Sequence, residues 1–189
     1  MNISEEVIKA SSALTKGGVI IYPTDTIWGL GCDAMNSKAI EKIMIIKKRP
    51  TNKSMLVLLD QAEKLSHYVD SMPAIAWDLI TQTSRPTTFI YPKVKNLPKI
   101  LVAADGSAAI RITNNDFCKR LIRLFGNPIV STSVNYFGQA PALKFSDIRK
   151  EIIKQVDYVV DPCISIVSDS KPSTIIRFLD DYSFEIVRD

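Results

Sequence analysis

The stretch Val19-Ile20-Ile21-Tyr22-Pro23-Thr24-Asp25-Thr26 decides the fold class of this chain. Its first four residues are apolar and mostly β-branched, which predicts a buried strand that ends at Pro23. Polar side chains follow directly at the exit of this strand. In open α/β sheets, ligands bind beyond the carboxyl ends of strands, so Thr24 and Thr26 are candidates for ligand contact. A polar turn explains this segment alone equally well.

Further apolar runs extend the pattern along the chain. Periodicity and turn residues predict strands at 19–22, 55–59, 87–91, 108–112, 129–132, 158–161, 174–178 and 184–187, and helices at 37–47, 73–83, 116–125 and 147–155. An N-terminal helix is predicted to begin with Ser4 as its cap and to end at Gly17-Gly18. We therefore expect an α/β fold, a twisted mixed β-sheet flanked by helices, in a single domain spanning 1–189.

Two segments carry more specific expectations. Gly29 and Gly31 are expected to allow a close backbone approach or a positive φ after the first strand. In the helix at 116–125, the spacing of Phe117, Leu121, Leu124 and Phe125 predicts a core face, which places Cys118 and the neighbouring cations away from the centre of that face.

A dense group of cations follows the helix predicted at 37–47. Lys47, Lys48, Arg49 and Lys53 lie within seven residues, and Pro50 ends the helix. Cations are favoured in a last helical turn, so an ordinary solvated helix end is one interpretation. The other is a polyphosphate site, because four neighbouring cations repel one another unless an anion screens them.

Arg111 and the segment Ser131–Asn135 are the next candidates. Arg111 interrupts a short apolar strand, and a buried arginine needs an anionic partner, which could be Asp105, Asp116 or a ligand. Ser131-Thr132-Ser133-Val134-Asn135 follows another predicted strand with four side chains that can donate or accept hydrogen bonds. Such uncharged groups beside a cationic cluster suit a nucleotide, although a polar turn remains an alternative.

Composition limits the function classes further. The chain has 189 residues, a net charge of +4 and three separated cysteines, Cys32, Cys118 and Cys163. We expect reduced thiols in a cytoplasmic protein, with no membrane association, because no apolar run is long enough for a span and no signal-peptide pattern begins the chain. A Walker loop, a G-x-G-x-x-G pattern and the common zinc motifs are absent, which argues against a tightly held metal.

Five sequence features together resemble one known family. They are Pro-Thr-Asp-Thr…Gly-Leu-Gly near residue 25, Lys47-x-Arg49-Pro50-x-x-Lys53, the Ala-x-Arg strand at Arg111, Ser131-Thr-Ser-x-Asn135, and Pro172-Ser-Thr-Ile-Ile176. Their order and spacing are similar to those of the YrdC-like threonylcarbamoyladenylate synthases, also called TsaC, of the single-domain type. The resemblance runs from about Val19 to Arg188.

The resemblance implies an enzyme, a nucleotidyltransferase. Members of the family join L-threonine, bicarbonate or CO₂, and ATP into L-threonylcarbamoyl-adenylate and release pyrophosphate, with Mg²⁺ bound to ATP and no protein metal site. The product supplies N6-threonylcarbamoyladenosine in tRNA through a downstream transferase complex. The implied partners are therefore the small substrates and that complex, with weak RNA contact as a further option.

The resemblance also assigns residues. The catalytic group would be Lys47, Arg49, Ser133 and Asn135. The ATP contacts would be these four with Lys53, Ser107 and Arg188. The threonine pocket would be lined by Thr26, Arg111, Ser131 and Ser173, with Arg111 pairing the substrate carboxylate.

One departure keeps alternatives open. The family often has a histidine in the threonine pocket where this chain has Leu58. A diverged paralogue without synthase activity is one alternative, and a non-catalytic RNA-binding module is the other.

Overall fold

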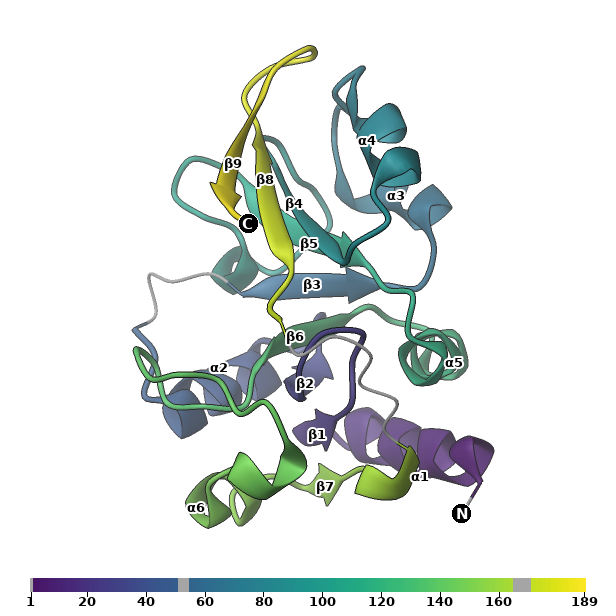
Figure 1. The fold of residues 1–189 in the computed structure, drawn as a ribbon, viewed down its shortest axis with the longest axis vertical. Helices are drawn as coiled ribbons and strands as arrows, with labels where there is room; N and C mark the ends of the chain where they lie inside the picture. Colours follow the sequence, from purple (N-terminus) through teal and green to yellow (C-terminus); the bar gives the residue numbers. More distant parts are fainter. Residues whose placement is uncertain (1, 51–54, 165–170) are drawn as a thin grey trace.

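The computed structural model describes residues 2–50, 55–164 and 171–189 (Figure 1). In these residues one nine-stranded sheet has the strand order β7-β1-β2-β6-β3-β5-β4-β8-β9. The strands are β1 (Ile20–Tyr22), β2 (Gly29–Asp33), β3 (Leu56–Leu59), β4 (Thr87–Tyr91), β5 (Ala108–Ile112), β6 (Ile129–Ser133), β7 (Tyr158–Val159), β8 (Thr174–Phe178) and β9 (Phe184–Arg188). Three neighbouring pairs, β1–β7, β3–β5 and β4–β8, are parallel and the others are antiparallel. The predicted mixed α/β sheet is confirmed.

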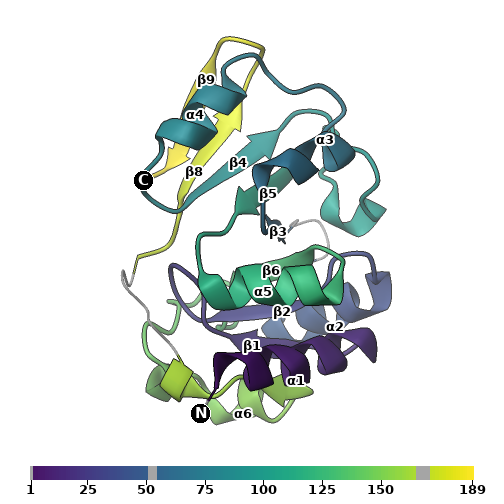
Figure 2. The ribbon, with the colours of Figure 1, turned by 90° about the vertical axis from the view of Figure 1, so that its right-hand side faces the viewer.

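Helices cover both faces of this sheet. They are α1 (Ile3–Thr15), α2 (Ser37–Lys47), α3 (Leu65–Tyr68), α4 (Ala76–Gln82), α5 (Asp116–Phe125) and α6 (Lys150–Ile153), with short 3₁₀ turns at 62–64, 99–101, 145–147 and 162–164. α1 and α5 lie together on one face of the half that contains β1, β2 and β6, and α2 lies on the other (Figure 2). α3 and α4 lie beside β4 and β5. None of the helices in the described ranges is long and apolar enough to cross a bilayer.

Two local predictions about helices are wrong. α1 is capped by Asn2, whose Oδ1 accepts a hydrogen bond from the Ser4 backbone N–H at 3.0 Å, so Ser4 lies inside the helix. In α5, Cys118 is buried and its Sγ lies 3.4 Å from the Pro23 carbonyl oxygen, whereas Leu124 is 55% exposed. The buried stripe of α5 consists of Phe117, Cys118, Leu121 and Ile122, so Ile122 takes the place predicted for Leu124.

β2 is the strand that periodicity did not predict. Its sequence, GLGCD, has two glycines, which weaken strand propensity and interrupt the apolar pattern. Packing explains them. A Cβ built on Gly31 would lie 2.5 Å from the Val130 carbonyl oxygen and 2.6 Å from Cε1 of Tyr22. The expected close backbone approach at Gly31 is confirmed, and neither glycine has a positive φ.

Gly31→Ala should therefore destabilise the fold strongly. The new methyl group meets backbone of β6, which cannot move without breaking the sheet, so we expect a loss of at least about 2 kcal/mol in unfolding free energy. Gly29→Ala is the matched control, because its Cβ would meet only side-chain atoms of Thr24 and Tyr22 at 3.0–3.2 Å. Urea titrations of both variants measure the difference, and equal losses would contradict the argument.

Candidate active site

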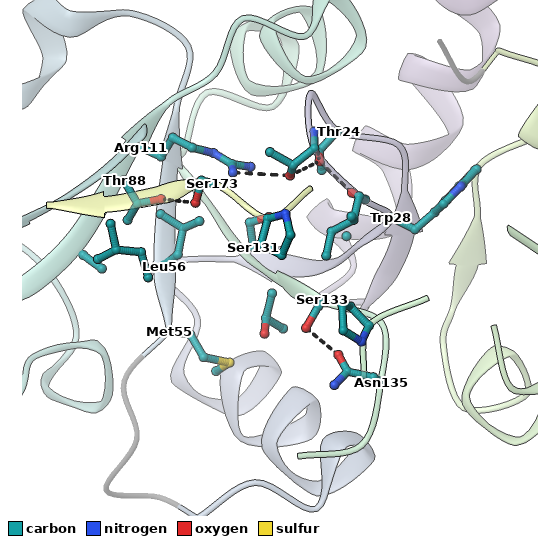
Figure 3. Close-up of a pocket in the computed structure, with 18 of the residues that line it drawn as sticks. Thr24, Trp28, Met55, Leu56, Thr88, Arg111, Ser131, Ser133, Asn135 and Ser173 are labelled. Carbon is teal, nitrogen blue, oxygen red and sulfur yellow. Dashed lines mark hydrogen bonds between the residues drawn. The ribbon is translucent and has the colours of Figure 1, made fainter. Parts of the chain in front are cut away.

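An open cleft lies where loops from both halves of the sheet meet over β6 and β5 (Figure 3). Its volume is about 420 Å³, within the usual range for small-molecule sites. Its walls are hydroxyl, amide, apolar and arginine side chains, and no carboxylate is among the described lining residues. They are Thr24, Thr26, Ile27, Trp28, Gly29, Arg49, Met55, Leu56, Thr88, Ala109, Arg111, Ser131, Thr132, Ser133, Asn135, Gln139, Pro141, Pro172, Ser173, Ile175 and Arg188.

Arg111 projects from β5 into the cleft and is 3% exposed. Its Nη2 lies 3.3 Å from Oδ1 of Asp25, and its Nη1 donates to Oγ1 of Thr26 at 3.4 Å. Both partners come from the loop after β1. The Nε of Arg111 is buried and has no hydrogen-bond partner among the described residues.

The predicted protein partners of Arg111 are wrong. Asp105 instead pairs with Arg177 at 3.2 Å, and Asp116 pairs with Arg120 one helical turn away. The true partner, Asp25, lies 86 positions before Arg111, and nothing in the sequence indicates that the loop after β1 reaches the end of β5.

Hydroxyl groups line the cleft beside Arg111. Thr88 and Ser173 share a hydrogen bond of 2.9 Å between their Oγ atoms, and both side chains are buried (Figure 3). Arg188 from β9 donates to the Ser173 carbonyl oxygen through Nε and Nη2, at 3.1 and 2.7 Å. β4, β8 and β9 therefore fix Ser173 together. Thr88 was not among the predicted site residues. The strand that carries it, 87–91, was predicted, but nothing in its sequence indicated that Thr88 faces a cleft.

At the other end of the cleft, β6 ends in a turn that presents Ser133 and Asn135. Ser133 Oγ is hydrogen-bonded to Oδ1 of Asn135, and Nδ2 of Asn135 donates to the carbonyl oxygens of Tyr136 and Gln139 at 3.0 and 2.6 Å. These bonds hold the turn in one shape. The guanidinium of Arg49 lines the same end of the cleft and lies over the Phe137 ring, 5.3 Å from its centroid.

Lys47 supports this turn from below and does not line the cleft. Its side chain is 1% exposed, and Nζ donates to the carbonyl oxygens of Ser133 and Asn135, the latter at 2.8 Å, and to Oδ1 of Asn135 at 3.4 Å. Burial, with the charge of Arg49 adding to it, lowers the pKa of Lys47 to about 7. In this structure Lys47 is thus a buried cation that fixes the Ser133–Asn135 turn.

The remaining predicted residues are placed as follows. Ser131 and Thr26 line the cleft beside Arg111, as the sequence predicted. Ser107 does not line it, because its Oγ donates to Asp105 at 2.6 Å before β5 begins. Lys53 lies outside the described residues. Leu58 is fully buried below α5 and is not a lining residue, so the substitution at this position does not alter the cleft wall.

The electrostatics of the cleft favour anions. Burial lowers the pKa values of Arg49 and Arg188, and the nearby charge of Arg111 lowers that of Arg188 further. These are the changes expected when cations lose water and repel one another. An anion in the cleft would relieve both effects. No group of three or more His, Cys, Asp or Glu in the described part of the chain could hold a metal ion.

Fold and cleft together define a class: an α/β protein with an open cleft lined by arginines, hydroxyl groups and one hydrogen-bonded turn, a lining that favours anions. Comparison with known proteins narrows the class to a family. The Sua5/YciO/YrdC family, described as "Telomere recombination", matches residues 12–189. The chain belongs to this family.

The most similar curated relatives include two proteins named threonylcarbamoyl-AMP synthase. The one from Pseudoalteromonas translucida (strain TAC 125) is 35% identical over 179 residues, covering 93% of this chain and 94% of the relative. The one from Hahella chejuensis is 36% identical over 168 residues, covering 88% and 90%. These names support the synthase interpretation and not the alternatives.

Solved structures share the fold. P. abyssi Sua5 complexed with L-threonine has a TM-score of 0.88 at 20% identity, and the alignment covers all of this chain and 54% of that one. The chain thus spans about half the length of that Sua5. E. coli YciO has a TM-score of 0.81 at 26% identity, covering 100% of this chain and 90% of that one.

The position of Lys47 predicts a pH dependence of stability. With its pKa near 7 in the folded state and near its ordinary value of 10.5 when unfolded, Lys47 binds fewer protons in the folded state between these two values. Stability from this group should therefore rise with pH above about 7 and be lost as pH falls towards 7, by at most about 1.4 kcal/mol per pH unit.

Urea unfolding of the wild type and of Lys47→Met between pH 6 and 9 measures this effect. The unfolding free energy of the wild type minus that of the variant should increase with pH. Lys48→Met is the matched control, because Lys48 is the exposed neighbour of Lys47. A difference that stays constant with pH would mean that the three oxygen acceptors keep Lys47 charged throughout.

Proposed function

We propose that this protein is a threonylcarbamoyl-AMP synthase that joins L-threonine, bicarbonate or CO₂, and ATP, and releases pyrophosphate. In class it is a nucleotidyltransferase. The observation that carries the proposal is the cleft itself, in which three arginines and a row of hydroxyl groups face one space, with no carboxylate among the described lining residues. Its curated relatives carry the name of this activity.

The two ends of the cleft suit two different anions. At one end, the guanidinium group of Arg111 lies beside the hydroxyl groups of Thr26, Ser131 and Ser173, which fits the carboxylate and polar groups of an amino acid. P. abyssi Sua5 has been solved with L-threonine, which supports this ligand. At the other end, Arg49 and the Ser133–Asn135 turn fit a phosphate chain. The bond to be made lies between the two.

The reaction needs positioning and charge neutralisation more than covalent chemistry. A carbamate oxygen attacks the α-phosphorus, and pyrophosphate leaves with the bonding electron pair. Both reactants are anions, so their approach requires nearby cations. Arg49 would stabilise charge on the phosphates, Arg188 would support Ser173 and the nearby anion, and Lys47 would act by holding the turn. No side chain is needed as a nucleophile.

Magnesium fits this cleft as a companion of ATP. The described lining residues provide hydroxyl and amide oxygens but no carboxylate, and Mg²⁺ commonly keeps several waters and binds mainly through substrate phosphates. Ser133 and Asn135 are the side chains best placed beside such an ion. When bound, Mg²⁺ would supply positive charge to the phosphate chain.

The product would be a reactive mixed anhydride, so a second enzyme must consume it. A tRNA threonylcarbamoyl-transferase complex is the partner that this chemistry implies. Direct RNA contact is a secondary proposal. The net charge of only +4 is modest for binding nucleic acid, so we expect such contact to be weak.

The test is pyrophosphate release from ATP and Mg²⁺ with L-threonine and bicarbonate. We expect release that depends on both, and less with L-serine. If ATP binds without threonine-dependent release, the chain is a diverged paralogue. If neither substrate binds while RNA does, with steep salt dependence, the protein is an RNA-binding module.

Arg49→Ala should lower the turnover about 100-fold or more, because removing one preorganised group from a developing charge commonly costs that much. The matched control is Arg120→Ala, which removes an exposed arginine on α5 whose partner is Asp116. Steady-state rates of both variants measure the effect. Comparable rates for Arg49→Ala and the wild type would refute the assignment of Arg49.

A further inference from the structure

The hydroxyl group of Thr24 has every hydrogen-bonding position filled by its own loop. Its Oγ1 donates its single proton to the Ile27 carbonyl oxygen at 2.6 Å, because a carbonyl can only accept. It accepts from the Thr26 backbone N–H at 3.1 Å. Its second lone pair faces Oγ1 of Thr26, 3.0 Å away. Thr24 lies on the cleft wall but is 1% exposed.

This arrangement fixes the direction of the next hydrogen bond. Since the proton of Thr24 is committed to Ile27, the contact between the two hydroxyl groups requires Thr26 to donate to Thr24. Thr26 Oγ1 also accepts from Nη1 of Arg111 at 3.4 Å. A hydroxyl group has one proton and two lone pairs, so Thr26 has one lone pair left for the cleft and no proton.

Arg111 has the opposite polarity. Its Nε is a buried donor without a partner among the described residues, Nη2 lies 3.3 Å from Oδ1 of Asp25, and Nη1 donates to Thr26. A ligand at this end of the cleft therefore meets guanidinium donors from Arg111 beside an acceptor oxygen from Thr26. An α-amino acid carries the complementary pair, a carboxylate and an amino N–H, on groups attached to the same carbon.

We propose that Thr24 is a positioning residue, which holds the proton of Thr26 away from the cleft so that Thr26 accepts a hydrogen bond from the amino N–H of the amino-acid substrate. This inference rests on the proposed function and deepens it. The contact survives carbamate formation, because the carbamate nitrogen of the substrate keeps one N–H. Without Thr24, the Thr26 proton can turn into the cleft and face the substrate N–H as a second donor.

The test compares Thr24→Val with Thr24→Ser. Valine keeps the shape of threonine and removes the hydroxyl group, so we expect the KM for L-threonine to rise about five- to tenfold, the size of one net hydrogen bond. The KM for ATP should change less than about twofold, since Thr24 has no part in phosphate binding. Serine restores the hydroxyl group and should bring the KM for L-threonine back to within about twofold of the wild type.

Thr87→Val is the matched control. It makes the same chemical change at a buried threonine whose Oγ1 donates to the Arg85 carbonyl oxygen at 3.0 Å and which does not line the cleft. Its KM for L-threonine should stay at the wild-type value. If Thr24→Val raised the KM for L-threonine and the KM for ATP equally, or if Thr24→Ser did not restore the KM for L-threonine, the positioning role would be overturned.

Calorimetric binding of L-threonine separates this proposal from the proposed function. If the wild type binds L-threonine but releases no pyrophosphate, the proposed function fails and the Kd ratios of the same variants decide the role of Thr24. If the wild type does not bind L-threonine, both fail.

A measurement on the wild type keeps the proposal testable if Thr24→Val does not fold. NMR should detect a slowly exchanging Thr26 hydroxyl proton with a nuclear Overhauser effect to the Thr24 side chain. A Thr26 hydroxyl proton that shows no such effect and exchanges freely with solvent would overturn the proposal.

Discussion

The cleft depends on keeping one arginine charged inside the sheet. Burying a guanidinium group is costly unless a carboxylate and further acceptors compensate it. Asp25 does so for Arg111, and its Oδ2 also accepts from the Asn114 backbone N–H at 3.1 Å, just after β5. Three strands, β2, β6 and β3, separate β1 from β5 in the sheet. Contact between the loops after β1 and β5 thus requires a strongly twisted sheet, and the same twist gathers the cleft residues from strands far apart in the order.

The sequence predicted the fold wherever one local signal dominated. The β-branched runs of β4, β5 and β8 were predicted with their observed ends, since apolar side chains and turn residues agree there. β2 was not, because its glycines serve a contact with Tyr22 and β6 that no local pattern records. The buried stripe of α5 was misplaced for a similar reason. Periodicity gives the width of an apolar face but not its rotation, which is set here by the packing of Cys118 against Pro23.

The sequence was enough to predict which segments meet at the site. It was not enough to predict which side chains pair with one another there. Motif resemblance brought Thr26, Arg111, Ser131 and Ser173 to one cleft, and the structure places all four there. The sequence could not show that Lys47 lies behind the wall, because a buried lysine and a lysine facing a ligand occupy the same helical position. Nor could it identify Asp25 as the partner of Arg111, since pairing over 86 positions depends on the sheet twist rather than on spacing.

The balance of charge favours an anion at the end of the cleft around Arg111. Arg111 and Arg188 approach this end from β5 and β9, and their mutual repulsion contributes to the lowered pKa of Arg188. Asp25 supplies one carboxylate close to Arg111, which compensates one of the two charges. The Ser173 carbonyl oxygen gives Arg188 a dipole but no charge. A second carboxylate, brought by a ligand, would complete the balance. Because that carboxylate is absent from the described protein wall, the affinity of this end for an anion follows from the same burial that makes Arg111 depend on Asp25.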